Sequence, residues 1–349
     1  MSEADLYDYE LPTELIAQEP LADRAAARLL VADRATGAMA HRHVRDLPEL
    51  LRPHDLVVVN DSRVVPARLV GRREKTGGRW EGLFLRVDTA TGGWELLAST
   101  RGSPALGERV LLDARDGGAA VPLTLVGRSA GGGWLARPEC QAPPQEILGR
   151  VGHVPLPGYI RGGVEAAGDR ERYQTVYARE SGSAAAPTAG LHFTDELLAR
   201  LGDRGVGLAR VTLHVGLGTF RPITAERIAD HLMHTEWCCC PPETVAAVAA
   251  ARARGGRVVA VGTTAARTLE SAALTGTLAP WAGPTDLFIR PGFSFRVVDS
   301  LMTNFHMPRT TLMVLVSTFA SRDLIARAYA EAIRERYRFL SYGDAMLLE

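Results

Sequence analysis

A strand, a turn and a helix follow one another in the pattern of residues 257–274, which read RVVAVGTTAARTLESAAL. The apolar run at 258–261 is short enough for a buried strand, and the run at 265–274 has helical composition. A strand that leads directly into a helix is the building unit of α/β sheets. Ligands of such sheets bind beside the carboxyl ends of the strands, so the turn Gly262-Thr263-Thr264 is a candidate binding site.

The same alternation of strand and helix patterns extends toward both ends of the chain. Thr194 is a suitable N-cap for a helix that begins at Asp195, and Gly202 is a natural stop for that helix. The sequence therefore predicts an α/β body. Its expected strands are 28–32, 56–59, 208–215, 258–261, 286–289 and 312–317, and its expected helices are 11–18, 44–51, 195–201, 243–254, 265–274 and 323–337.

The sequence pattern changes between residues 66 and 155, where short stretches of alternating apolar and polar residues are separated by glycine-rich turns. Such a pattern is typical of an all-β barrel or sandwich. We expect a discontinuous α/β domain over 1–65 and 156–349, interrupted by a small, barrel-like all-β domain over 66–155. Its expected strands are 68–71, 80–87, 94–98, 109–112, 121–126 and 134–136.

The composition is that of an ordinary globular protein, with 46% hydrophobic and 23% charged residues among 349. No signal peptide and no apolar run of roughly 18 residues is present, so we expect no membrane segment and a cytoplasmic location. The four cysteines, three of them adjacent, do not form a disulfide framework. The formal net charge is zero, so binding of a nucleic acid would need a local basic face.

Several short motifs carry polar side chains at expected strand ends. The turn Gly262-Thr263-Thr264 could hold a carboxylate or phosphate, although one of its threonines could equally be a simple N-cap. His214 ends a strand before a Gly-x-Gly turn, where it could reach a site or be a satisfied core histidine. Arg221 occupies the place of the third glycine of a dinucleotide fingerprint, which excludes a nicotinamide site. Glu270 could be a general base or a surface charge.

A metal site is a second hypothesis for the segment that contains His231, His234 and Glu236, followed by Cys238 to Cys240. The three consecutive cysteines lack the usual C-x₂-C separation, and no second pair matches them. We therefore expect no metal. A different segment, GSAAAPTAGLHFT at 182–194, has many small residues before His192 and a helix start. Small residues allow close approach of a ligand to the backbone, which favours a site over a plain loop.

Taken together, these segments resemble one family, the S-adenosylmethionine:tRNA ribosyltransferase-isomerases of queuosine biosynthesis. The resemblance covers nearly the whole chain and departs from the usual pattern only locally, at Arg79-Trp80-Glu81, Gly158, Arg309-Thr310-Thr311 and the cysteine triplet. The segments that carry the resemblance are DYELPTELIAQEPLADRAAARLLV, NDSRVVPARL, YQTVYA, AAPTAGLHFT, VTLHVGLGTFRP, DHLMHTE, VGTTAARTLES, TNFH and YRFLSYGDAM.

The resemblance implies a reaction on 7-aminomethyl-7-deazaguanine at the wobble position of tRNA. The ribosyl part of S-adenosylmethionine moves to the aminomethyl nitrogen and rearranges to an epoxycyclopentane, which gives epoxyqueuosine and releases adenine and methionine. S-adenosylmethionine is then a co-substrate, with no separate cofactor, and the two-domain architecture agrees with the family. We expect the chain to act as a monomer, with tRNA and S-adenosylmethionine as its partners.

The candidate site residues lie in the segments that resemble the family. A base must remove a proton beside the sulfonium and an acid must assist the departure of adenine. The catalytic candidates, whose individual roles stay open, are His192, His214, Glu270, His306 and Asp344. Candidates for binding S-adenosylmethionine are Thr188, Gly190, Gly262, Thr263, Thr264, Arg267, Asp286 and Asn304. Candidates for binding tRNA are Arg63, Arg221, Arg290 and, as a stacking partner for a base, Tyr342.

Because His192 stands close to a helix start, the helix dipole should lower its pKa and keep the imidazole neutral. Two other classes of function stay open at this point. A non-catalytic RNA-binding protein could use the β domain as an oligonucleotide platform. A phosphate-binding α/β enzyme of small-molecule metabolism could use the Gly262 turn.

Overall fold

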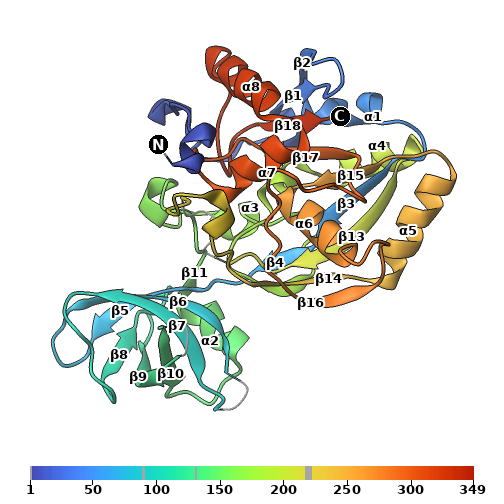
Figure 1. Ribbon diagram of the computed structural model, residues 1–349. Helices are drawn as coiled ribbons and strands as arrows, with labels where there is room; N and C mark the ends of the chain where they lie inside the picture. Colours follow the sequence, from blue (N-terminus) through green and yellow to red (C-terminus); the bar gives the residue numbers. More distant parts are fainter. Residues whose placement is uncertain (1, 89–90, 130–131, 217–221) are drawn as a thin grey trace. The chain divides into compact units, whose positions relative to one another are not determined.

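The computed structural model describes residues 2–88, 91–129, 132–216 and 222–349 (Figure 1). Contacts divide the chain into two compact units. The first, the body, comprises Met1–Arg63, Pro157–Gly162 and Arg172–Glu349, and the second, the barrel unit, comprises Val64–Leu156 and Gly163–Glu171. The segment 163–171 thus joins the barrel unit, although the sequence suggested an insertion over 66–155 alone.

The body is built on a mixed sheet that has nine strands in the part of the chain that the structure describes. Its central strands β13, β3, β15 and β17 run parallel to one another, whereas β18 is antiparallel to β17. The strand order is β16 (Trp281–Thr285), β14 (Glu236–Cys240), β13 (Gly207–Leu213), β3 (Leu56–Asn60), β15 (Val258–Val261), β17 (Ser300–Asn304), β18 (Ala345–Leu348), β1 (Arg28–Ala32) and β2 (Met39–His43).

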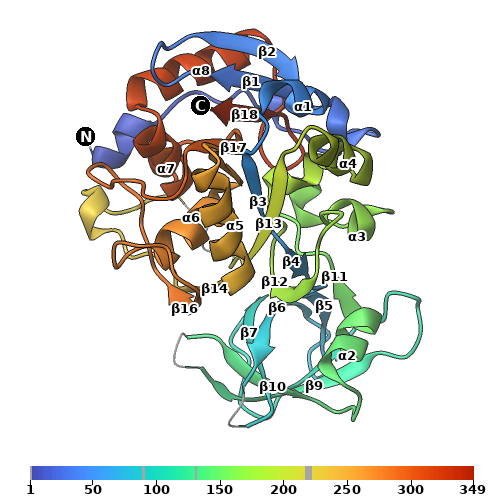
Figure 2. The same cartoon turned by 90° about the vertical axis from the view of Figure 1, so that its right-hand side faces the viewer.

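Helices cover both faces of this sheet, which explains why its central strands are continuous apolar runs. Along β3, Val58 faces one core cluster and Val57 and Val59 face the other. The first cluster takes side chains from α5 (Pro242–Ala253), α6 (Thr263–Ala272), α7 (Thr311–Phe319) and α8 (Arg322–Arg334). The second takes side chains from α1 (Leu47–Leu50), α4 (Asp195–Asp203) and the 3-10 helix η6 (Thr188–His192), and Figure 2 shows α5 and α6 opposite α4 across β3 and β13.

Two expected strands of the body are wrong. Residues 312–317 belong to helix α7, whose N-cap Thr310 accepts a hydrogen bond from the Met313 amide at 3.4 Å. A short, fully buried apolar run has no polar face, so its periodicity does not separate helix from strand. Residues 286–289 form no strand and follow β16 instead. Strands β2, β14, β16, β17 and β18 of this sheet were not expected.

The expected helix at 11–18 is also wrong, because only a 3-10 turn, η2 (Thr13–Leu15), forms there. Other expectations are confirmed closely. Strand β1 has the bounds 28–32, and Thr194 caps α4 by accepting a hydrogen bond from the Leu197 amide at 3.1 Å. Helix α4 continues past Gly202 to Asp203.

The barrel unit is a closed antiparallel sheet, which confirms the expected barrel-like all-β architecture. Strand β8 pairs back with β5, and Gly71 permits this closure because a Cβ there would lie 2.2 Å from the Leu111 carbonyl oxygen. Trp80, Trp94 and Trp134 are buried. Around the barrel the strands are β5 (Arg68–Arg73), β6 (Arg79–Val87), β7 (Trp94–Thr100), β10 (Trp134–Pro138), β9 (Val121–Arg128) and β8 (Arg109–Leu112).

Strand β11 (Gly152–His153) adds to β5, and helix α2 (Pro144–Val151) precedes it. Among the residues that the structure describes, no helix has the length and apolar character needed to cross a bilayer.

Candidate active site

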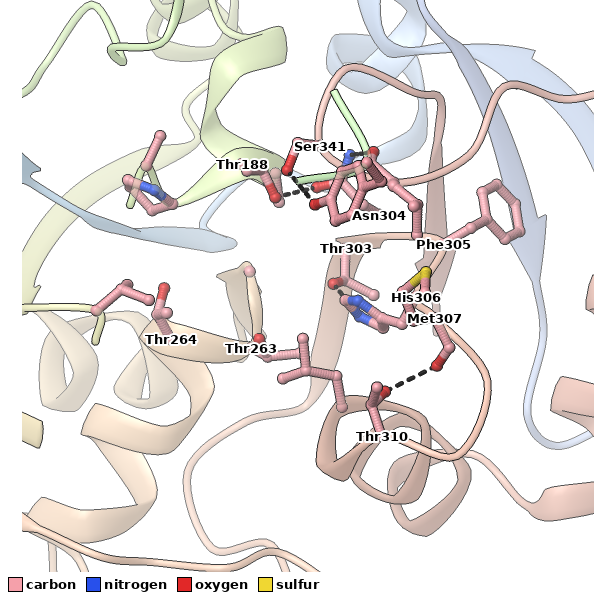
Figure 3. A pocket seen from close by; sticks show the side chains of 18 residues that line it. Thr188, Thr263, Thr264, Thr303, Asn304, Phe305, His306, Met307, Thr310 and Ser341 are labelled. Carbon is pink, nitrogen blue, oxygen red and sulfur yellow. Dashed lines mark hydrogen bonds between the residues drawn. The ribbon is translucent and has the colours of Figure 1, made fainter. Parts of the chain in front are cut away.

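A cleft opens at the carboxyl ends of β15 and β17, where open α/β sheets bind their ligands (Figure 3). It holds about 620 Å³ of empty space, a figure that includes the solvent at its open mouth. None of the described residues that line it carries a formal charge at neutral pH. They are Tyr159, Ala186, Pro187, Thr188, Ala189, Val215, Gly262, Thr263, Thr264, Thr303, Asn304, Phe305, His306, Met307, Thr310, Leu312, Leu340 and Ser341.

The first wall of the cleft is the turn between β15 and α6. The N-cap of α6 is Gly262, at φ 88°, and it offers no side chain to the first-turn amides. The reading of Thr263 or Thr264 as a simple N-cap is therefore wrong. The hydroxyl of Thr264 is buried and has no hydrogen-bond partner among the described residues. Free amides, a free hydroxyl and the positive end of the helix dipole together suit an anionic group.

The opposite wall is formed by the end of β17. Asn304 accepts a hydrogen bond from the Thr188 hydroxyl at 2.9 Å through its Oδ1 (Figure 3). Its Nδ2 points to the carbonyls of Leu340 and Asp344 at 3.3 and 3.4 Å, and to His192 Nε2 at 3.4 Å. These contacts fix the orientation of the amide, so the Thr188–Asn304 pair presents defined polar atoms to the cleft.

His306 is the histidine that lines the cleft within the described ranges. Burial lowers its pKa to about 3, so the imidazole is neutral at pH 7. Its Nε2 lies 3.1 Å from the Thr303 hydroxyl, and its amide donates to the Tyr329 hydroxyl at 2.8 Å. The second titratable side chain of the lining is Tyr159, whose hydroxyl lies 2.7 Å from that of Ser341 and whose pKa is raised to about 12 by burial.

His192 lies behind Asn304 and does not line the cleft. Burial lowers its pKa to about 4, and a hydrogen bond to the backbone of Arg24 opposes this shift. The expected direction of the shift is thus found, but its cause is burial and not a helix dipole. His192 ends η6, and α4 begins only at Asp195. Its connection to the cleft runs through Asn304, whose Nδ2 lies 3.4 Å from its Nε2.

His214, Glu270 and Asp344 lie away from the cleft. The ring of His214 stacks on Trp237 with 5.4 Å between the ring centroids, while the next residue, Val215, lines the cleft; both residues follow the end of β13 at Leu213. Burial lowers the pKa of His214.

Glu270 accepts hydrogen bonds from the amides of Arg296, Val297 and Val298 at 2.9, 3.0 and 3.0 Å. Asp344 accepts hydrogen bonds from the amides of Arg28 and Arg338 at 2.9 and 2.8 Å, and burial raises its pKa. Both carboxyl groups therefore hold backbone segments in place. The reading of Glu270 as a surface charge is wrong, because its side chain is fully buried.

Three of the residues expected to bind S-adenosylmethionine also lie elsewhere. The guanidinium of Arg267 pairs with Glu236, and both side chains are almost completely buried. Asp286 is exposed. Gly190 is small for an internal reason, because a Cβ there would lie 2.1 Å from the hydroxyl oxygen of Tyr177. The other expected residues, Thr188, the Gly262 turn and Asn304, surround the cleft.

The residues expected to bind tRNA are scattered. Arg63 and Arg290 are exposed, and the guanidinium of Arg63 donates to the Ala178 carbonyl. Tyr342 is buried, with its ring edge-on to Tyr173 at 5.8 Å, so it does not offer an open stacking face. Arg221 lies outside the described residues.

The second half of the segment considered for a metal, Glu236–Cys240, forms strand β14, in which Cys238 and Cys240 are buried; His231 and His234 precede this strand. Glu236, which begins this strand, is held by Arg267. Within the described ranges, no group of three His, Cys, Asp or Glu side chains is arranged to hold a metal ion.

Sequence reasoning missed Tyr159, Thr303 and Ser341 as parts of the cleft. Thr303 and Ser341 lie in the segments TNFH and YRFLSYGDAM, and the resemblance of these segments to the family could have revealed both residues. Tyr159 had no such signal, because it reaches the cleft from the segment 157–162, which returns to the body between two parts of the barrel unit.

Comparisons with known proteins agree with this architecture. A family model described as queuosine biosynthesis protein matches residues 4–348. The S-adenosylmethionine:tRNA ribosyltransferase-isomerase of Symbiobacterium thermophilum is 52% identical over 98% of both chains, and that of Xanthomonas oryzae is 51% identical over 100% of this chain and 97% of its own.

A solved structure, the S-adenosylmethionine tRNA ribosyltransferase of Thermotoga maritima, is similar with a TM-score of 0.56 and 37% identity. The similarity covers 99% of this chain and 100% of the other.

Proposed function

Because this chain belongs to the queuosine biosynthesis family, as an S-adenosylmethionine:tRNA ribosyltransferase-isomerase, we propose that the cleft at the ends of β15 and β17 binds S-adenosylmethionine. The family sets aside the two alternatives, a non-catalytic RNA-binding protein and a phosphate-binding enzyme of small-molecule metabolism. The proposed reaction moves the ribosyl group to the aminomethyl nitrogen of 7-aminomethyl-7-deazaguanine in tRNA. Epoxyqueuosine forms, and adenine and methionine leave.

The observation that carries this placement is the uncapped start of α6. The methionine part of the substrate has a carboxylate, and the first-turn amides with the unpartnered Thr264 hydroxyl supply donors for it. A nearby side-chain cation is not required, which fits the position of Arg267 outside the cleft. The sulfonium is a cation, and an uncharged wall of hydroxyl, amide and apolar groups does not repel it.

The opposite wall supplies the groups for the ribose and for proton transfer. The fixed Thr188–Asn304 pair offers a donor and acceptor arrangement for ribose hydroxyls. His306 is the proposed base for the carbon beside the sulfonium, because it is the histidine that lines the cleft within the described ranges. His192 is then a positioning residue that keeps the Asn304 amide in one orientation. Tyr159, with a raised pKa, stays protonated and can donate a hydrogen bond to a leaving group.

The test is the release of adenine. The purified protein is incubated with S-adenosylmethionine and tRNA that carries 7-aminomethyl-7-deazaguanine, and adenine is measured by chromatography. We expect adenine in proportion to the modified tRNA, and none with the same tRNA carrying guanine at the wobble position. No adenine with the authentic tRNA would contradict the proposal.

Further properties of the enzyme are predictions that stand beside this test. We propose that no metal or separate cofactor takes part, so a chelator should leave the rate of adenine release unchanged. We also propose that the chain acts as a monomer in the cytoplasm. Sedimentation of the purified protein, alone and with tRNA, and fractionation of cells test these two points.

A further inference from the structure

A second, smaller pocket adjoins the cleft and shares Ser341 with it. The Tyr159 hydroxyl, which lines the cleft, bonds to Ser341 at their boundary. In contrast to the cleft, this second pocket is basic, and none of the described residues that line it is acidic. They are Pro20, Leu21, Arg24, Ala27, Arg172, Leu191, His192, Ser341, Tyr342 and Gly343.

Two arginine side chains give this pocket its charge. The guanidinium of Arg24 donates to the Gln174 carbonyl at 2.7 Å, and that of Arg172 donates to the Leu21 and Pro20 carbonyls at 2.8 and 3.1 Å. Carbonyl oxygens orient a guanidinium but do not neutralise its charge. Both arginines line the same pocket, and burial together with the positive charge of Arg172 lowers the pKa of Arg24.

A third arginine, Arg338, adds to the same positive field. Its guanidinium donates to the Glu19 carbonyl, next to Pro20 of the pocket, and its Nη1 is buried without a hydrogen-bond partner among the described residues. The charges of Arg24 and Arg338 both act to lower the pKa of His192 in the pocket wall. Asp344 is near Arg338, but it accepts backbone amides and does not line the pocket.

We propose that this basic pocket holds a backbone phosphate of the tRNA anticodon loop, next to the nucleotide whose base enters the cleft. The inference rests on the proposed function and adds the place where the RNA backbone docks. Planar guanidinium groups match phosphate oxygens, and their partly buried setting strengthens the attraction. A chain of zero net charge needs such a local site to bind RNA.

The position of the pocket also favours a phosphate over the substrate carboxylate. The cleft already has donors for a carboxylate at the start of α6, on the wall formed by Gly262 and Thr264. The basic pocket meets the cleft at Ser341 instead. A nucleotide whose base is unstacked into the cleft carries its own phosphate only one sugar away, so adjoining pockets suit one nucleotide.

The first experiment compares Arg172→Gln with wild type in the full-length protein. Affinity for an anticodon stem-loop is measured by filter binding from 50 to 300 mM salt, and the Michaelis constant for S-adenosylmethionine is measured by adenine release. We expect binding about tenfold weaker and a slope of log Kd against log salt reduced by about 0.7. The Michaelis constant for S-adenosylmethionine should not change, and Arg172→Lys, which keeps the charge, should recover part of the affinity.

The matched control is Arg254→Gln, an exposed arginine after α5, which should leave both the affinity and the slope as in wild type. An unchanged slope for Arg172→Gln would overturn the proposal. A raised Michaelis constant for S-adenosylmethionine with unchanged RNA binding would also overturn it, and would assign the pocket to the carboxylate.

A second experiment needs no variant, and so it holds even if Arg172→Gln does not fold. Stem-loops with a neutral methylphosphonate at single positions are tested against the wild-type protein. One position at or beside the wobble nucleotide should weaken binding about tenfold and lower the salt slope. Equal, small losses at every position would contradict the proposal. Adenine release by the same preparation tests the proposed function separately, so the two can fail independently.

Discussion

The two adjoining pockets of the body share Ser341 but differ in charge. The cleft at the ends of β15 and β17 is lined by hydroxyl, amide and apolar groups, and its histidine is neutral. The second pocket is lined by Arg24 and Arg172. A substrate that carries its own cation and carboxylate fits the uncharged cleft, whereas a polyanion needs the basic pocket. In our proposal, this difference separates the two substrates of one reaction, and the following changes test that separation.

The largest effect is expected for His306→Asn. If proton transfer takes place in the uncharged cleft, loss of the imidazole should lower kcat for adenine release by about 10² to 10³, with little change in tRNA affinity. Steady-state assays and filter binding measure the two quantities. His43→Asn, on the edge strand β2, is the control and should keep full activity. If the His306→Asn enzyme kept the wild-type kcat, proton transfer would not take place in this cleft.

Acid should destabilise the body through its buried histidines. The folded pKa values of His192 and His306, about 4 and about 3, lie below the ordinary value of 6.5. The unfolded chain therefore takes up protons first, and stability is lost as the pH falls below about 6.5. Each histidine should cost about 2 kcal/mol at pH 5.

Urea unfolding at pH 7.5 and pH 5.0 measures this loss. His306→Asn should reduce the difference between the two pH values by about 2 kcal/mol, and His43→Asn should not reduce it. An equal difference in wild type and His306→Asn would show that His306 is not kept neutral by burial.

Glu270→Gln tests whether the far end of α6 belongs to the site. Its carboxylate accepts amides of Arg296, Val297 and Val298, so the change should lower the free energy of unfolding by about 2 kcal/mol. The folded fraction should keep its kcat within about twofold. Glu243→Gln, on the exposed first turn of α5, is the control for stability. If Glu270→Gln greatly lowered kcat and left the stability normal, Glu270 would be a catalytic residue after all.

The smallest effect is expected for Thr264→Val. Removing the buried, unpartnered hydroxyl should raise the Michaelis constant for S-adenosylmethionine about tenfold and leave kcat and tRNA affinity unchanged. Thr264→Ser keeps the hydroxyl and should behave as wild type, and so should Thr277→Val at an exposed position. If Thr264→Val weakened tRNA binding and left the Michaelis constant for S-adenosylmethionine unchanged, the cleft would be the RNA site, which would contradict the assignment of the two pockets.

Some site residues could be predicted from the sequence because local order placed them. Gly262, Thr263 and Thr264 follow a strand and begin a helix, and Asn304 and His306 lie in the word TNFH, which resembles its family counterpart. Other expected residues do not line the cleft, for reasons of geometry. His214 and Val215 both follow β13, but Val215 lines the cleft whereas the ring of His214 stacks on Trp237. Arg267 lies one turn beyond Thr263 on α6, but its guanidinium pairs with Glu236.

By itself, the sequence determined the α/β alternation, the strands of the barrel and the family. The first two depend on local periodicity, and the family depends on long segments that resemble those of its members. Only the tertiary structure decided which polar groups meet. The parallel order of β3, β15 and β17 brings Gly262 beside Asn304, and the return of the segment around Tyr159 completes the wall. Such convergence depends on contacts between residues far apart in the chain, and local patterns carry no information about them.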